Sequence, residues 1–154
     1  MLLTDAPELI SVHNNVYYLQ YSDSLAGDVF MITDNEPFYS LISAFSKIFY
    51  HAELDYQYCL LTIDCNTVAI CMISEGKYKM FDSHSRDIYG ILDPFGKCVL
   101  VSVDGLDNLA LYFQSSHRFM CSQNTALPFE IKGVKLSNSD NTIIRNNDCN
   151  LTDT

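Results

Sequence analysis

Three short runs of β-branched, aromatic and other apolar residues follow one another along the middle of the chain, and they constrain its fold more than any other feature. The runs are YCLLTI at 58–63, TVAICMI at 67–73 and KYKMFD at 77–82. Short polar segments, DCN and then SEG, separate them, and both have the residues of tight turns. The sequence therefore predicts an antiparallel meander of three strands. The first two are apolar throughout, so we expect them to be central.

Four further runs predict strands on either side of this meander. Val16–Tyr21 and Asp28–Ile32 flank a polar segment and could pair as a hairpin. Lys97–Val103 is rich in valine, and Phe129–Leu136 alternates apolar and polar residues as an edge strand does. With the meander, these runs give six or seven strands, most of them antiparallel.

Two stretches have the apolar spacing of helices. The first begins after Pro37, a residue that suits the first position of a helix, and is expected to cover about 38–50. The second is a short helix of about ten residues that starts at Leu106. Their apolar stripes are typical of packing against a sheet, so we attach no function to them. Strands and helices together predict the α+β class.

The size and composition of the chain indicate one folded domain. A chain of 154 residues makes one domain or a portion of a larger one, and 48% hydrophobic residues are ample for a core. From Ser137 onward the composition shifts to Asn, Asp, Ser and Thr. We therefore expect a single globular domain over 1–136, either whole or a portion of a larger domain, and a polar, flexible tail over 137–154.

Charge narrows the classes of partner. Nine basic residues against nineteen acidic ones leave a net charge of −10, and a surface of that sign repels phosphate groups. Nucleic acid and anionic membrane are therefore not expected as partners, whereas a basic protein or peptide is. The first ten residues lack the basic and apolar regions of a signal peptide, and no apolar run approaches the ~20 residues that span a bilayer.

The cysteines give no sign of a metal or redox centre. They lie at 59, 65, 71, 98, 121 and 149, without any C-x-x-C pair. Cys59 and Cys71 fall inside apolar strands, where a cysteine packs as a small hydrophobic residue. We interpret the set as reduced thiols in an intracellular, reducing compartment, and we predict no cofactor.

The segment FDSHSR, Phe81–Arg86, is the candidate for chemistry because it ends a strand and opens a loop. In an extended chain, residues i and i+2 point to the same side, so the Asp82 carboxylate can reach Nδ1 of His84. The second ring nitrogen is then presented as a base. This is the base and orienting half of a catalytic triad.

Plainer interpretations of the same residues stand beside this one. Asp82 can cap the following turn through its own backbone, and His84 can be an ordinary surface residue. Arg86 is expected to pair structurally with Asp82 or Asp87. A metal site built from Asp82, His84 and Asp87 has too few strong ligands to be favoured. The other histidines lack a D-x-H partner and are expected on the surface: His13, His51 and His117.

Several of these segments together resemble a known family. The stretch LLTIDCNTVAI at 60–70, the FDSHSR motif, Gly90, Pro94, Gly96 and the helix at 106–114 are similar to the deubiquitinating cysteine peptidase of the herpesvirus large tegument protein and to tegument-like deubiquitinases outside herpesviruses. The resemblance covers about Tyr56–Ser115. It implies a papain-like α+β fold, in which 1–136 would be part of a larger peptidase domain. It also implies that the protein is a thiol peptidase that acts on ubiquitin isopeptide bonds. His84 would then be the general base and Asp82 its orienting residue. Ubiquitin or a ubiquitin-like protein is the implied partner.

The chain departs from the family in its nucleophile. In the family a cysteine near a helix N-terminus precedes the D-x-H, with a Gln upstream of it. Here no cysteine precedes Cys59, Gln20 has no accompanying motif, and Cys98 and Cys121 follow the D-x-H. We expect an upstream or partner segment to supply the nucleophile. The alternatives are a catalytically inactive ubiquitin-binding module and an interaction protein unrelated to ubiquitin.

Overall fold

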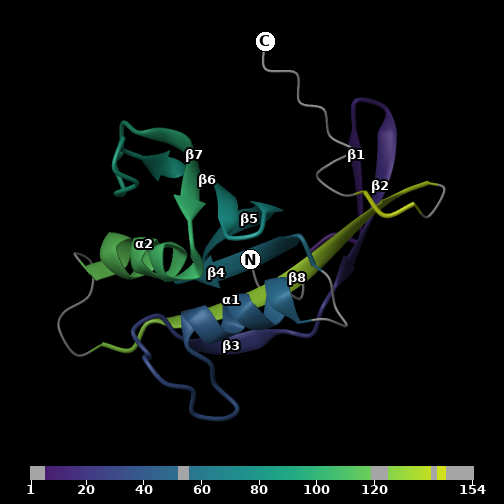
Figure 1. The fold of residues 1–154 in the computed structure, drawn as a ribbon. Helices are drawn as coiled ribbons and strands as arrows, with labels where there is room; N and C mark the ends of the chain where they lie inside the picture. Colours follow the sequence, from purple (N-terminus) through teal and green to yellow (C-terminus); the bar gives the residue numbers. More distant parts are fainter. Residues whose placement is uncertain (1–5, 52–55, 119–124, 140–141, 145–154) are drawn as a thin grey trace.

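The computed structural model describes residues 6–51, 56–118, 125–139 and 142–144, and these ranges form one sheet and two helices (Figure 1). This arrangement confirms the predicted α+β class, with eight strands where six or seven were expected. In chain order the elements are β1 Leu9–Val12, β2 Asn15–Tyr21, β3 Leu25–Asp28, α1 Leu41–Tyr50, β4 Tyr58–Ile63, β5 Asn66–Ser74, β6 Lys77–Arg86, β7 Lys97–Asp104, α2 Leu106–Arg118 and β8 Pro128–Asn138.

The predicted meander is confirmed and extends over four strands. β4, β5, β6 and β7 pair consecutively and antiparallel. The turn between β4 and β5 has positive φ at both Asp64 and Cys65, as a two-residue hairpin turn requires. Gly76, with φ +71, supplies the same freedom between β5 and β6. Local turn residues therefore set the order of this half of the sheet.

The last strand lies at the centre of the sheet, so the prediction of an edge strand was wrong. The strand order is β1-β2-β8-β4-β5-β6-β7, and β3 also pairs with β8. Phe129 and Ile131 of β8 are buried beneath the helices, whereas the intervening residues face the side of the sheet without helices. The alternation along β8 therefore reflects these two faces and does not mark an edge.

The expected hairpin near the N-terminus is also wrong. The segment 29–32 is not a strand, because β3 ends at Asp28, whose carboxylate accepts the amides of Phe30 and Leu127. β2 pairs with the second half of β8 and β3 with the first half, so they do not pair with each other. The partner of β2 in a hairpin is β1, which the sequence did not predict.

The helix α1 begins at Leu41, a few residues later than the position of Pro37 suggested. The cap is Ser40, whose Oγ accepts the amide of Ser43 at 3.3 Å, and the amide of Ser40 in turn donates to Asp34 Oδ1 at 2.9 Å. These two bonds fix where the first turn starts.

Removing this cap should have a modest, local effect. We expect Ser40→Ala to lower the free energy of unfolding by about 1 kcal/mol, the usual cost of losing a serine N-cap. Ser46→Ala, at an exposed position inside the same helix, should be neutral or slightly stabilising. Urea denaturation of both variants measures the difference. Equal effects of the two substitutions would contradict the assignment of Ser40 as the cap.

Both helices pack on one face of the sheet and enclose a single core. The apolar stripe of α1 is buried as predicted, and the Phe45 ring lies 6.2 Å from the Phe113 ring of α2. Beneath them lie Leu61, Ile70 and Met80, each about 1% exposed or less. Neither helix in the described ranges is long and apolar enough to cross a membrane. The core thus fixes β4, β5 and β6 against α2, which positions the site described next.

Candidate functional site

The FDSHSR segment continues β6, which runs to Arg86 and does not end near Asp82 as predicted. Its pairing with β7 is regular from Lys77 to Asp82 and then shifts, so that the next pair is Arg86 with Lys97. Asp82, His84 and Arg86 occupy alternate positions along this irregular part of the strand. Asp82 and Arg86 are buried and His84 is partly exposed. The strand therefore directs three polar side chains to one side.

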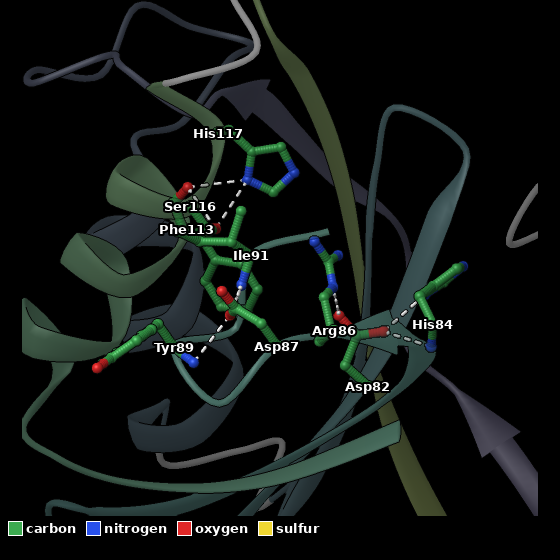
Figure 2. Close-up of polar contacts among 9 residues, drawn as sticks. All are labelled: Asp82, His84, Arg86, Asp87, Tyr89, Ile91, Phe113, Ser116 and His117. Carbon is green, nitrogen blue, oxygen red and sulfur yellow. Dashed lines mark hydrogen bonds and ion pairs between the residues drawn. The ribbon is translucent and has the colours of Figure 1, made fainter. Parts of the chain in front are cut away.

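Asp82 and His84 are in direct contact (Figure 2). Oδ1 of Asp82 lies 2.6 Å from Nδ1 of His84 and also accepts the backbone amide of His84 at 2.9 Å. This is the contact expected from the i, i+2 spacing. The hydrogen bond from the His84 amide shows that Asp82 also orders the backbone next to it. The structural and the chemical interpretations of this residue therefore hold together. Within the described ranges, Asp82 is the polar partner of the His84 ring.

The second oxygen of the carboxylate binds Arg86. Nε of Arg86 donates to Oδ2 of Asp82 at 2.7 Å, which confirms the expected structural pairing of Arg86. The side chains of Arg86 and Asp82 are only 5% and 3% exposed, whereas that of His84 is 32% exposed. The buried ion pair therefore supports an imidazole that solvent or a substrate can reach.

The protonation of Asp82 follows from these contacts. Burial by itself would raise the pKa of this carboxyl, but the hydrogen bonds from the amide and ring of His84 and the charge of Arg86 outweigh it. The net result is a pKa of Asp82 below its ordinary value. Asp82 is therefore an anion at neutral pH.

This lowered pKa predicts how stability depends on pH. The ionised Asp82 contributes its full stabilisation above the ordinary Asp pKa of about 3.9 and loses it as the pH falls through the lower, folded-state value. The difference in unfolding free energy between the unmodified protein and Asp82→Asn should therefore shrink below about pH 4. Urea denaturation at pH 6 and at pH 3 measures it. A difference that stays constant or grows in acid would contradict the prediction.

Asp87 does not join the pair. Its Oδ1 accepts the amides of Tyr89 and Ile91 at 2.8 and 2.9 Å and so shapes the loop after β6 (Figure 2). No cluster of three His, Cys, Asp or Glu side chains suited to a metal ion occurs in the described part of the chain. Asp87 thus has a structural role in the loop.

His117 is buried, so its prediction as a surface residue was wrong. It is 8% exposed, and its Nδ1 lies 2.9 Å from the carbonyl oxygen of Phe113. The reason is that α2 extends to Arg118, which places residue 117 one turn beyond the buried Phe113 on the same side of the helix. Together with Tyr112, Asp82 and Arg86, it lines a small cavity. His13 and His51 are exposed, as expected.

The four cysteines in the described ranges differ in environment. Cys59 is buried in β4, and this burial, together with the neighbouring Cys71, raises the pKa of its thiol well above the ordinary value. Cys71 is partly buried, and Cys65 and Cys98 are exposed. A buried thiol with a raised pKa is a poor nucleophile, so the packing role predicted for Cys59 is confirmed. Cys121 and Cys149 lie outside the described residues.

Comparison with known proteins identifies the fold. No protein-family model matches the chain, and no curated protein sequence matches it either. A solved structure does match: the ubiquitin-specific protease encoded by a murine cytomegalovirus tegument protein, in complex with a ubiquitin-based suicide substrate. The TM-score is 0.67 at 14% sequence identity, and the match covers 95% of this chain and 58% of that one.

The chain shares the fold of the matched part of that protease. The expected fold, α+β and a portion of a papain-like fold, is therefore confirmed. At this identity the likeness concerns the fold, and the chain spans little more than half the length of the viral protease chain. The roles of Asp82 and His84 and the source of the nucleophile remain predictions.

Proposed function

We propose that this chain supplies the histidine and aspartate of a deubiquitinase-like thiol peptidase that hydrolyses ubiquitin isopeptide bonds. His84 is the general base and Asp82 orients it. The observation that supports this most is the 2.6 Å contact between Asp82 Oδ1 and His84 Nδ1 on a fold shared with a ubiquitin-specific protease. A base held by a buried anion, with its ring partly open to solvent, is what thiol activation requires.

The reaction depends on which nitrogen of the His84 ring carries the hydrogen. The Asp82 anion holds Nδ1 as an N–H donor, so Nε2 keeps its lone pair. Nε2 takes the proton of the attacking thiol, and the thiolate adds to the isopeptide carbonyl. The imidazolium then returns the proton to the departing lysine amine, which leaves a thioester. Water activated by Nε2 hydrolyses the thioester and releases the thiol.

The nucleophile in this proposal comes from a segment other than the described ones, either upstream in the same protein or in a partner chain. Two observations support this. Nδ1 of His84 contacts Asp82 and not a thiol. Cys59, the most buried of them, has a raised thiol pKa, which disfavours the thiolate. A reducing compartment, in which we place the protein, keeps such a nucleophile active.

The proposed protein substrate is ubiquitin or a ubiquitin-like protein, and neither nucleic acid nor membrane is a proposed partner. The net charge of −10 complements the basic face of ubiquitin. We expect binding of free ubiquitin to weaken about fivefold when salt rises from low to about 0.5 M, because exposed charge pairs are screened. Isothermal titration at the two ionic strengths measures this. An affinity that does not change with salt would contradict the electrostatic part of the proposal.

The test of the function is reaction with ubiquitin that carries an electrophile at its C-terminus. The chain is assayed by itself, joined to any upstream segment of its natural protein (the joined form), and mixed with any partner chain that copurifies with it, and intact mass reports the adduct. We expect one ubiquitin on one cysteine in the joined form or on the partner chain. No adduct in any of these forms would refute the peptidase, and ubiquitin binding without an adduct would support the inactive binding module instead.

A further inference from the structure

We propose that Arg86 is a positioning residue for the Asp82–His84 pair, and that the loop from Asp87 to Gly96 holds Arg86 in place. The inference rests on the proposed function for the role of His84 as a base. Its geometric part concerns the folded chain and can be measured without any reaction. Nothing in the D-x-H pattern itself requires an arginine.

The first step is the division of the carboxylate between two partners. Oδ1 of Asp82 binds the amide and ring of His84, and Oδ2 binds Nε of Arg86 at 2.7 Å (Figure 2). The terminal torsion of an aspartate is soft, so one oxygen held alone leaves the plane of the group free to turn. With both oxygens bound, the plane is fixed and Oδ1 is aimed at Nδ1 of His84.

The second step is charge. Asp82 and Arg86 are both almost fully buried, and Asp82 is the carboxylate partner of Arg86 within the described ranges. A guanidinium stays charged at any accessible pH, so it keeps the buried carboxylate ionised. Arg86 thereby keeps Oδ1 of Asp82 a charged acceptor for the His84 ring.

The third step is the loop. The backbone passes so close at Gly96 that an added Cβ would fall on the carbonyl and amide of Arg86. In addition, Leu92 forms a β-bridge with Arg86, and the amide of Asp93 donates to the Ser85 carbonyl at 3.1 Å. Side chains build the loop itself: Asp87 accepts two loop amides and Asp93 accepts the amide of Phe95 at 2.9 Å. The backbone of Arg86 is thus held at two points by a loop with its own internal bonds.

On the opposite side, residues of α2 face Arg86 across a small cavity. Tyr112, Phe113 and His117 line this cavity together with Arg86 and Asp82. Among the described residues the buried hydroxyl of Tyr112 has no hydrogen-bond partner, so it does not bind Arg86. Within the same ranges the Arg86 side chain binds Asp82, and loop and helix together hold it in the orientation that fixes the Asp82 carboxylate.

The experiment compares Arg86→Met, Arg86→Lys and Gly96→Ala with Gly76→Ala as control. Gly76 has φ +71 and open space around it, so its substitution strains a distant turn without touching Arg86. Two readouts are taken on folded protein: the nitrogen-15 shifts of the His84 ring at a pH where it is neutral, which give the share of rings with hydrogen on Nδ1, and the rate of reaction with the ubiquitin electrophile in the joined form. The nitrogen-15 readout needs no nucleophile and is therefore informative even if the proposed function fails.

We expect Arg86→Met to lower the share of the neutral His84 ring that has hydrogen on Nδ1, because Oδ2 of Asp82 is then unbound and the carboxylate can turn away from Nδ1. The reaction rate should fall about 10- to 100-fold, as is usual when the support of a reacting group is removed. Arg86→Lys, which retains the charge, should recover part of both effects. It also keeps the test valid if the methionine variant does not fold.

Gly96→Ala should lower the share of hydrogen on Nδ1 as Arg86→Met does, and Gly76→Ala should leave it unchanged. A share that is the same in all four variants as in the unmodified protein would refute the positioning role. So would equal changes in the Gly96 and Gly76 variants, because they would show a loss of stability alone. The expected change in the tautomer with no reaction in any form would retain the positioning role and refute the peptidase.

Discussion

Replacing His84 with alanine should reduce reaction with the ubiquitin electrophile by a factor of about 10² to 10⁴, the usual contribution of a general base. The effect should be large because the His84 ring is the base that Asp82 contacts. Within the described ranges, no other proton acceptor is in contact with this carboxylate. A substitution here leaves the hydrophobic core intact, since His84 is partly exposed and is not one of the core residues. The rate is measured by intact mass in the joined form.

His51→Ala is the matched control, because His51 is exposed at the end of α1. It should react at the unmodified rate, and so should Cys121→Ala, since Cys121 follows the D-x-H in the chain. Retention of the full rate in His84→Ala would contradict the assignment of the base. Loss of the rate in Cys121→Ala would identify Cys121 as the nucleophile and contradict the proposed external source.

Asp82→Ala should be the most destabilising substitution in the site, at a cost of about 3 to 5 kcal/mol of unfolding free energy. The variant leaves the guanidinium of Arg86, 5% exposed, without its carboxylate. It also removes the acceptor of the His84 amide. Urea denaturation at neutral pH measures the loss, and Asp104→Ala, an exposed carboxylate at the end of β7, should cost less than about 0.5 kcal/mol.

A double variant separates stability from chemistry. Replacing both partners of a buried ion pair with apolar residues is commonly neutral or stabilising, so Asp82→Leu with Arg86→Met should recover most of the stability that Asp82→Ala loses. It should not recover reaction with the electrophile, because His84 has lost its orienting anion. A loss below about 1 kcal/mol in Asp82→Ala would show that Arg86 finds another acceptor.

Local signals made part of the fold predictable. The strands from 58 to 104 are joined by turns whose residues have positive φ or glycine, and these are visible in the sequence. The D-x-H contact is local too, since it depends only on two side chains being alternate in an extended segment. The contact between the carboxylate and the imidazole is therefore predictable from residue spacing alone.

The remaining errors arose where distant segments decide the outcome. The position of β8 depends on pairing with β2, β3 and β4, which no local pattern specifies. β3 contains Gly27, a poor strand former that is required because Tyr39 packs directly on its backbone. His117 is buried because α2 runs one turn further than its apolar stripe indicated. In each case tertiary contacts outweighed local propensity.

The orientation of the His84 ring is the physical claim on which the proposed chemistry depends, and nitrogen-15 NMR of the imidazole tests it directly. At a pH where the ring is neutral, we predict the tautomer with hydrogen on Nδ1, bonded to Asp82, and a lone pair on Nε2. In Asp82→Asn this preference should weaken. Hydrogen on Nε2 in the unmodified protein, or a tautomer that does not respond to Asp82→Asn, would contradict the account.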